Sequence, residues 1–116
     1  MGFMSRLMRM TVFVLVVAGA FVRAADESAL GLARRHWARY GKTVSKISLD
    51  CLSWKAMPDP DVPGATAIDV LEKHDARCGG DPQTAPTVAY LRVDKGRIYL
   101  WNAGQDRYLL WTGKRK

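Results

Sequence analysis

The sequence has little of the material from which metal centres and catalytic clusters are built. It holds two cysteines and two histidines among 116 residues, and a zinc site would need more ligands than His74 and Cys78 offer. It has no internal repeat, no low-complexity tract and no catalytic motif such as G-x-S-x-G. With 48% hydrophobic and 25% charged residues, the composition excludes a collagen-like, coiled-coil or acidic disordered chain and fits one small globular domain.

Long apolar runs are also scarce, and the one that is present lies near the start of the chain. The stretch 11–22 (TVFVLVVAGAFV) follows two arginines and no acidic residue, as in a secretory signal peptide. It is shorter than the roughly 20 residues that span a bilayer, which favours a cleaved signal over an uncleaved membrane anchor. We expect cleavage after Ala24 or Ala25, a signal peptide over 1–24, a single domain over 25–116, a periplasmic location and no transmembrane segment in the mature chain.

Removal of the signal peptide lowers the net charge. The whole chain carries 18 basic and 11 acidic residues, a formal charge of +7, and three of the arginines lie in the first 24 residues. The mature chain therefore carries about +4, and three of its basic residues form the terminal run 114–116, so the folded body is nearly neutral. We expect no nucleic-acid partner for an exported domain of this charge.

Both cysteines, Cys51 and Cys78, lie in the exported part of the chain. Two thiols in an oxidising compartment most simply form a disulfide. Their spacing is not the C-x-x-C of a redox pair. The sequence therefore predicts one structural disulfide, which the loop-closure relation values at about 3 to 4 kcal/mol.

The mature sequence begins with a helical pattern and continues with a strand pattern. Apolar residues recur every three or four positions over 26–40, which predicts a helix that ends near Gly41. From Thr43 the apolar residues alternate up to Cys51 and then change phase, which predicts a strand with a bulge near that cysteine. The proline-rich stretch 57–64 predicts an irregular surface loop.

The second half of the chain predicts a run of strands. The segment 65–78 fits either a helix or a strand, and we favour the strand because a helix would place Asp75 in the apolar stripe. Residues 87–94 and 97–101 alternate around a hairpin loop in which Gly96 takes a positive φ, and 108–111 gives a further strand. Together these elements predict an α+β fold, with one N-terminal helix packed on an antiparallel meander of about four or five strands.

The run E-x-H-x-x-x-C-G-G-D-P-x-T-x-P over residues 72–86 resembles a segment of small uncharacterised exported proteins of Gram-negative bacteria. The resemblance covers roughly the central third of the chain. It implies a periplasmic setting and an architecture distantly similar to PepSY-type domains, in which a helix lies over an antiparallel sheet. It implies no activity, because fold analogy alone does not assign one.

The same run contains four polar residues that could serve a catalyst. Glu72, His74, Asp75 and Asp81 lie within ten positions, which would allow a general base or a set of metal ligands. On a strand Glu72 and His74 would share a face and could simply pair, and no nucleophile, oxyanion hole or full ligand set accompanies them. We expect no enzymatic activity, no metal and no cofactor; a small hydrolase or metal-dependent enzyme centred on Glu72 and His74 is the alternative.

Aromatic residues give the better functional lead. The mature chain has four tryptophans and four tyrosines, more than one small core can bury with every N–H and O–H satisfied. If Ile98 and Leu100 face the helix, the residues that alternate with them form an exposed strip. The predicted binding surface consists of Arg97, Tyr99, Trp101 and Arg107.

Exposed tryptophan, tyrosine and arginine are typical of recognition surfaces. The sequence therefore predicts a non-enzymatic periplasmic binding or inhibitory module that docks a protein or a cell-wall component through this surface. A structural envelope protein without a discrete ligand is a further alternative.

Overall fold

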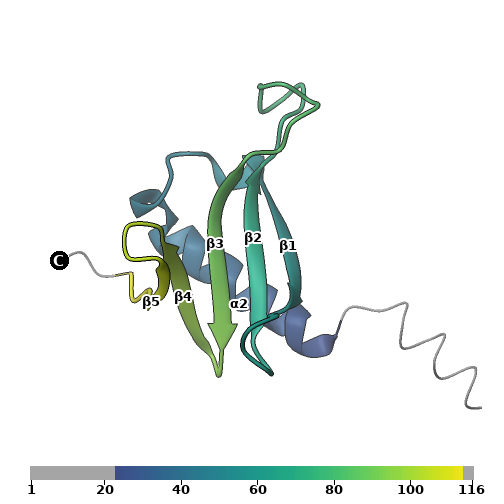
Figure 1. The fold of residues 1–116 in the computed structure, drawn as a ribbon. Coiled ribbons are helices and arrows are strands. Elements are labelled where there is room, and N and C mark those ends of the chain that lie inside the picture. The colour runs from purple at the N-terminus through teal and green to yellow at the C-terminus, as the bar shows by residue number, and fades with distance from the viewer. Residues whose placement is uncertain (1–22, 114–116) are drawn as a thin grey trace, which may run out of the picture.

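The computed structural model describes residues 23–113, which form one α-helix and five β-strands. The helix α2 (Ala24–Tyr40) crosses one face of the sheet, and no other described helix covers the opposite face (Figure 1). The predicted signal peptide lies outside the described residues except for Arg23 and Ala24. No helix within 23–113 combines the length and the hydrophobicity needed to cross a membrane.

The five strands form an antiparallel meander. They are β1 (Leu52–Pro58), β2 (Thr66–Glu72), β3 (Thr87–Asp94), β4 (Arg97–Asn102) and β5 (Arg107–Leu110). Their spatial order is β1-β2-β3-β4-β5, so each strand pairs with its neighbours in the sequence. The predicted α+β class, with one helix on an antiparallel meander, is confirmed.

Helix α2 packs through small residues and one large one. Ala29, Ala33 and Trp37 recur every fourth position and are buried against the sheet. The two alanines let the helix approach closely, and Trp37 meets the ring of Trp54 on β1 edge-on at 5.5 Å. The helix ends at Gly41, where any side chain would overlap the ring of Trp37.

The core lies between α2 and the central strands. Ile68 and Val70 of β2 and Leu91 of β3 are fully buried, and they alternate with residues on the opposite face of the sheet. The C-terminal end of the described chain closes the side of this core, because Trp111 contacts Trp37 at a centroid distance of 5.6 Å.

The prediction of a strand from Thr43 to Cys51 is wrong. Two short 3-10 turns, Gly41–Thr43 and Leu49–Cys51, lie there, and β1 begins only at Leu52. The reason is that β2 ends at Glu72 and offers no partner beyond one last hydrogen bond, from the amide of Lys73 to the carbonyl of Cys51 (2.8 Å). A strand without a partner leaves its backbone groups unpaired, so the chain forms turns instead.

The ambiguous segment 65–78 divides into two parts. Residues Thr66–Glu72 form β2, with a register shift between Val70 and Leu71, whereas 73–86 form a long loop. This loop projects beyond the end of the sheet between β2 and β3 (Figure 1). The next connection is a two-residue hairpin loop in which Lys95 and Gly96 both have positive φ (51° and 77°), as a type I′ turn requires.

Candidate functional site

The face of the sheet opposite α2 carries a group of aromatic and charged side chains. We call it the open face. Its membership follows from strand alternation, because its residues occupy the positions between the helix-facing core residues. Its larger side chains are Lys55, Met57, Asp69, Tyr90, Arg92, Arg97, Tyr99, Trp101, Tyr108 and Leu110.

The aromatic side chains of the open face form a cluster over β3, β4 and β5. The register places Trp101 opposite Tyr108, and their rings meet edge-on at 5.1 Å. Tyr90 and Leu110 are 45% and 53% exposed, whereas Tyr99, Trp101 and Tyr108 are half-buried. The cluster therefore presents apolar area to solvent on a rigid β-sheet.

Arg92 lies in the middle of this cluster and is held from two sides. Its Nε donates to Oδ2 of Asp59 at 2.8 Å, and its Cζ lies 4.1 Å from the centre of the Tyr108 ring, a cation–π contact. Oδ1 of Asp59 accepts from the amides of Asp61 (2.8 Å) and Val62 (3.0 Å). Arg92 thus ties the proline-rich loop after β1 to the ring of Tyr108 on β5.

These contacts set the charge state of the groups. Burial by itself would raise the pKa of Asp59, but the hydrogen bond from Arg92 and the two backbone amides together lower the pKa below its ordinary value. The hydrogen bond to Asp59 raises the pKa of Arg92. Burial raises the pKa of Tyr108, although the positive charge of Arg92 opposes this shift. At neutral pH the cluster therefore holds a fixed cation, its buried carboxylate and a neutral phenol.

Three of the four residues of the predicted binding surface share the open face. Arg97, Tyr99 and Trp101 are alternate residues of β4, and Ile98 between them is buried on the helix side. Arg107 is different. The register pairs it with Asn102, which places it in the phase of the helix-facing residues, exposed at the start of β5.

The arginine at the centre of the open face is Arg92, which the prediction did not include. The alternation of Tyr90 and Arg92 along β3 is visible in the sequence and could have placed both beside Trp101. Its partner Asp59 could not be found in this way, because it lies in a loop 33 residues away. Near one end of β3, a hollow of about 240 Å³ lies between Tyr90 and Trp101.

The predicted polar cluster consists of Glu72, His74, Asp75 and Asp81. Its side chains stabilise the loop 73–86. Nε2 of His74 lies 3.5 Å from a carboxylate oxygen of Glu72, so the two side chains pair. Nδ1 of His74 lies 2.9 Å from the carbonyl oxygen of Asp81, which can only accept, so Nδ1 is the donor. A hydroxyl of Thr84 also lies within 3.1 Å of Nδ1. His74 therefore joins the start of the loop to its second half, at Asp81 and Thr84.

The two aspartates of this cluster do not face His74 with their carboxylates. Oδ1 of Asp75 accepts from the amides of Arg77 (3.0 Å) and Cys78 (2.8 Å), and Oδ1 of Asp81 accepts from the amide of Gln83 (3.0 Å). Both carboxylates stabilise local turns. Across residues 23–113 no three His, Cys, Asp or Glu side chains are grouped so that they could hold a metal ion.

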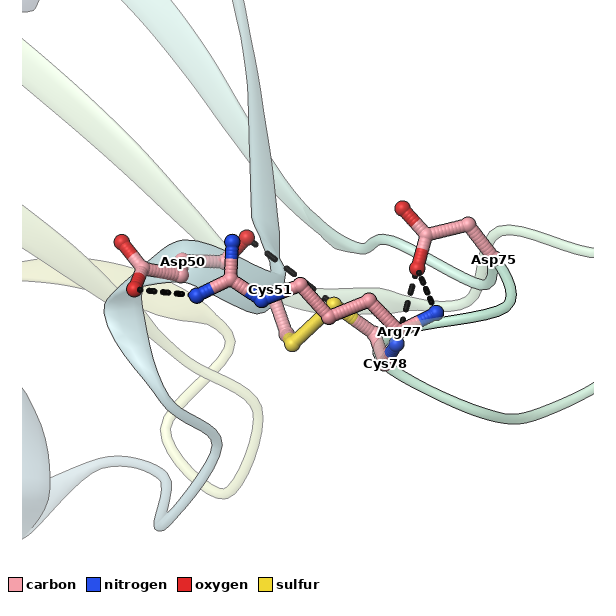
Figure 2. Close-up of a disulfide and its surroundings, with 5 residues drawn as sticks. All are labelled: Asp50, Cys51, Asp75, Arg77 and Cys78. Carbon is pink, nitrogen blue, oxygen red and sulfur yellow. Dashed lines mark hydrogen bonds and ion pairs between the residues drawn. A yellow bond between two sulfur atoms is a disulfide. The ribbon is translucent and has the colours of Figure 1, made fainter.

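The predicted disulfide between Cys51 and Cys78 is confirmed, with a Cα–Cα distance of 5.6 Å. It joins the turn before β1 to the projecting loop, and Asp75 caps the turn that carries Cys78 (Figure 2). An exposed ion pair between Arg77 and Asp50 at 3.4 Å lies beside the bridge. The bridge therefore anchors the base of the loop to the sheet.

Comparison with known protein-family models, with curated proteins and with solved structures finds no match for this chain.

Proposed function

We propose that this protein is an exported, non-enzymatic binding or inhibitory module of the periplasm, and that its open face docks a partner protein. The aromatic cluster around Arg92 is the observation that carries the proposal. It lies on the sheet face that α2 leaves uncovered, and it combines exposed apolar area with a cation whose side chain is held in place. Tyrosine, tryptophan and arginine are the residue types that contribute most to protein–protein affinity.

A protein fits this surface better than a glycan does. The open face mixes the apolar side chains of Met57 and Leu110 with charges of both signs, Arg97 and Asp69 among them, which is the make-up of a protein interface. Arg92 and Tyr90 come to the surface from a rigid strand, so little side-chain entropy is lost on binding. The disulfide and the leader pattern of residues 1–24 support the location, because disulfides persist in oxidising compartments.

The test uses point variants of the open face and one control variant outside it. Tyr90 is 45% exposed, so Tyr90→Ala removes an anchor with little loss of packing, and Trp101→Ala removes the ring that packs against Tyr108. Leu49→Ala is the control, because Leu49 is 40% exposed but lies in the turn before β1. We expect a protein that wild type and Leu49→Ala retain from periplasmic extract to be lost with both aromatic variants, by at least tenfold in affinity.

The stability of each variant is measured by urea unfolding, so that loss of binding is separated from loss of fold. Equal retention by all four proteins would overturn the proposed surface. Retention of insoluble cell wall in place of a protein, with the same dependence on Tyr90 and Trp101, would overturn the protein partner in favour of a glycan.

A further inference from the structure

The first turn of α2 contains a buried carboxylate that lies next to the expected signal-peptide cleavage site. Asp26 is 1% exposed, and Oδ1 accepts a hydrogen bond from the hydroxyl of Thr66 on β2 at 2.6 Å. The guanidinium of Arg23 binds the same carboxylate with two hydrogen bonds, from Nε at 3.1 Å and from Nη2 at 2.9 Å. The hydrogen bond from Arg23 is the main reason that the pKa of Asp26 lies below its ordinary value.

Cleavage after Ala24 or Ala25 would remove Arg23. The processed chain would also lose the Arg23 carbonyl, which accepts from the amides of Asp26 (3.0 Å) and Glu27 (3.2 Å). A buried carboxylate that loses its counter-ion is strongly destabilising. Asp26 has no other ion pair within the described part of the chain, so processing must either weaken the start of α2 or supply a new cation.

We infer that Asp26 is a binding site for the α-ammonium group that processing creates at Ala25 or at Asp26 itself. Adjacent Cα atoms are about 3.8 Å apart, so the new ammonium is at most one residue from the carboxylate. A positive charge at a helix N-terminus is unfavourable by itself, and the pair with Asp26 offsets that cost. The site accepts the guanidinium of Arg23 before processing and the ammonium group after it.

A hollow beside this site gives the new terminus room to settle. It measures about 230 Å³ and lies between Ala25 and Thr66, with Lys95 of the β3–β4 turn on its rim. Lys95 is the other cation that could serve Asp26, so it provides the competing explanation. The inference rests on the export part of the proposed function, because cleavage supplies the ammonium group, and it is independent of what the open face binds.

The experiment begins with the processed protein from the periplasm of a Gram-negative host. Its intact mass gives the first residue. Acetylation near pH 6.5 then modifies the α-amino group selectively, because its pKa of about 7.7 to 8 lies well below that of lysine. The folding equilibrium constant is measured by urea unfolding for the free and acetylated forms of wild type, Asp26→Asn and Lys95→Met.

We expect acetylation to lower the folding equilibrium constant about tenfold in wild type and in Lys95→Met, and less than about twofold in Asp26→Asn. An equal effect of acetylation in wild type and Asp26→Asn would overturn the inference. So would a loss of stability in Lys95→Met together with no effect of acetylation, since Lys95 would then be the counter-ion. A mass that retains Arg23 would instead overturn the processing on which the inference rests.

One measurement needs no variant and covers the case in which Asp26→Asn does not fold. The rate of acetylation of the α-amino group, followed against pH, reports its pKa in the folded protein and in urea. We expect a higher pKa in the folded protein because the Asp26 carboxylate stabilises the charged form. A pKa that is equal or lower in the folded protein would overturn the pairing.

Discussion

Replacing Arg92 with methionine tests whether the open face is organised by its buried ion pair. Methionine keeps most of the length and the apolar stem of the side chain but removes the guanidinium. The carboxylate of Asp59, whose side chain is 2% exposed, would then keep only the amides of Asp61 and Val62. Removal of one partner of a buried pair costs about 3 to 5 kcal/mol.

We expect Arg92→Met to lower the free energy of unfolding by about 2 to 3 kcal/mol, which is at the lower end of that range or slightly below it. Two amides still hold the carboxylate, and the Arg92 side chain is itself 18% exposed. Asp59→Asn keeps an oxygen for both amides, so the double variant Arg92→Met/Asp59→Asn should recover at least about 1 kcal/mol relative to the sum of the single changes. Urea unfolding followed by tryptophan fluorescence gives all four free energies.

The pH dependence gives an independent check of the same pair. In wild type the folded-state pKa of Asp59 is lowered, so its contribution to stability is fully present above the unfolded pKa of about 3.9 and is lost below that value, as the pH falls through the lower folded-state pKa. In Arg92→Met burial dominates and raises the pKa, so protonation relieves the penalty. The difference in stability between the two proteins should therefore shrink as the pH falls from 7 to about 3.5. The account of this pair would be refuted if Arg92→Met lowered the free energy of unfolding by less than about 0.5 kcal/mol at neutral pH and the double variant showed no coupling between positions 92 and 59.

Three further predictions concern other parts of the structure. Cys78→Ser should cost about 3 to 4 kcal/mol of unfolding free energy, and the native protein should show no reactive thiol; stoichiometric labelling would contradict the bridge. Gly80→Ala should destabilise the protein more than Gly79→Ala in thermal melts, because both glycines have positive φ but only Gly80 lies against the ring of His74; equal losses would contradict this packing. Burial lowers the pKa of His36, so stability should fall as the pH drops below about 6.5, and His36→Phe should remove this slope in unfolding measured between pH 5 and 7.5; an unchanged slope would show that other groups cause it.

Sequence patterns were sufficient where the structure depends on nearby residues. The helix predicted over 26–40 spans Ala24–Tyr40, and the hairpin loop lies at Lys95 and Gly96 because a two-residue turn with two positive φ angles favours glycine there. The strand predicted up to Cys51 failed because alternation over a few residues does not show whether a partner strand exists. Only the tertiary position of β2 decides that question.

The same distinction applies to the candidate site. The alternation along β4 placed Tyr99 and Trp101 on one face from the sequence alone. Which face each residue of β5 occupies depends on the four-residue loop 103–106, and this loop places Arg107 in the phase of the helix-facing residues. The pair between Arg92 and Asp59 joins a strand to a proline-rich loop. The burial of Asp26 likewise depends on packing against β2, which the residues around it in the sequence do not show.

The meander has a consequence for the order in which the chain folds. Since every strand pairs with the next one along the chain, most contacts within the sheet are local, and only the β2–β3 connection over 73–86 is long. Folding should therefore be fast for a β-rich protein. The β1–β2 hairpin and the disulfide need no residue beyond Cys78, so both can form before the rest of the chain has folded. The contact between Trp37 and Trp111 spans most of the described chain. Closure of that side of the core therefore waits until Trp111, which follows the last strand, has packed against Trp37.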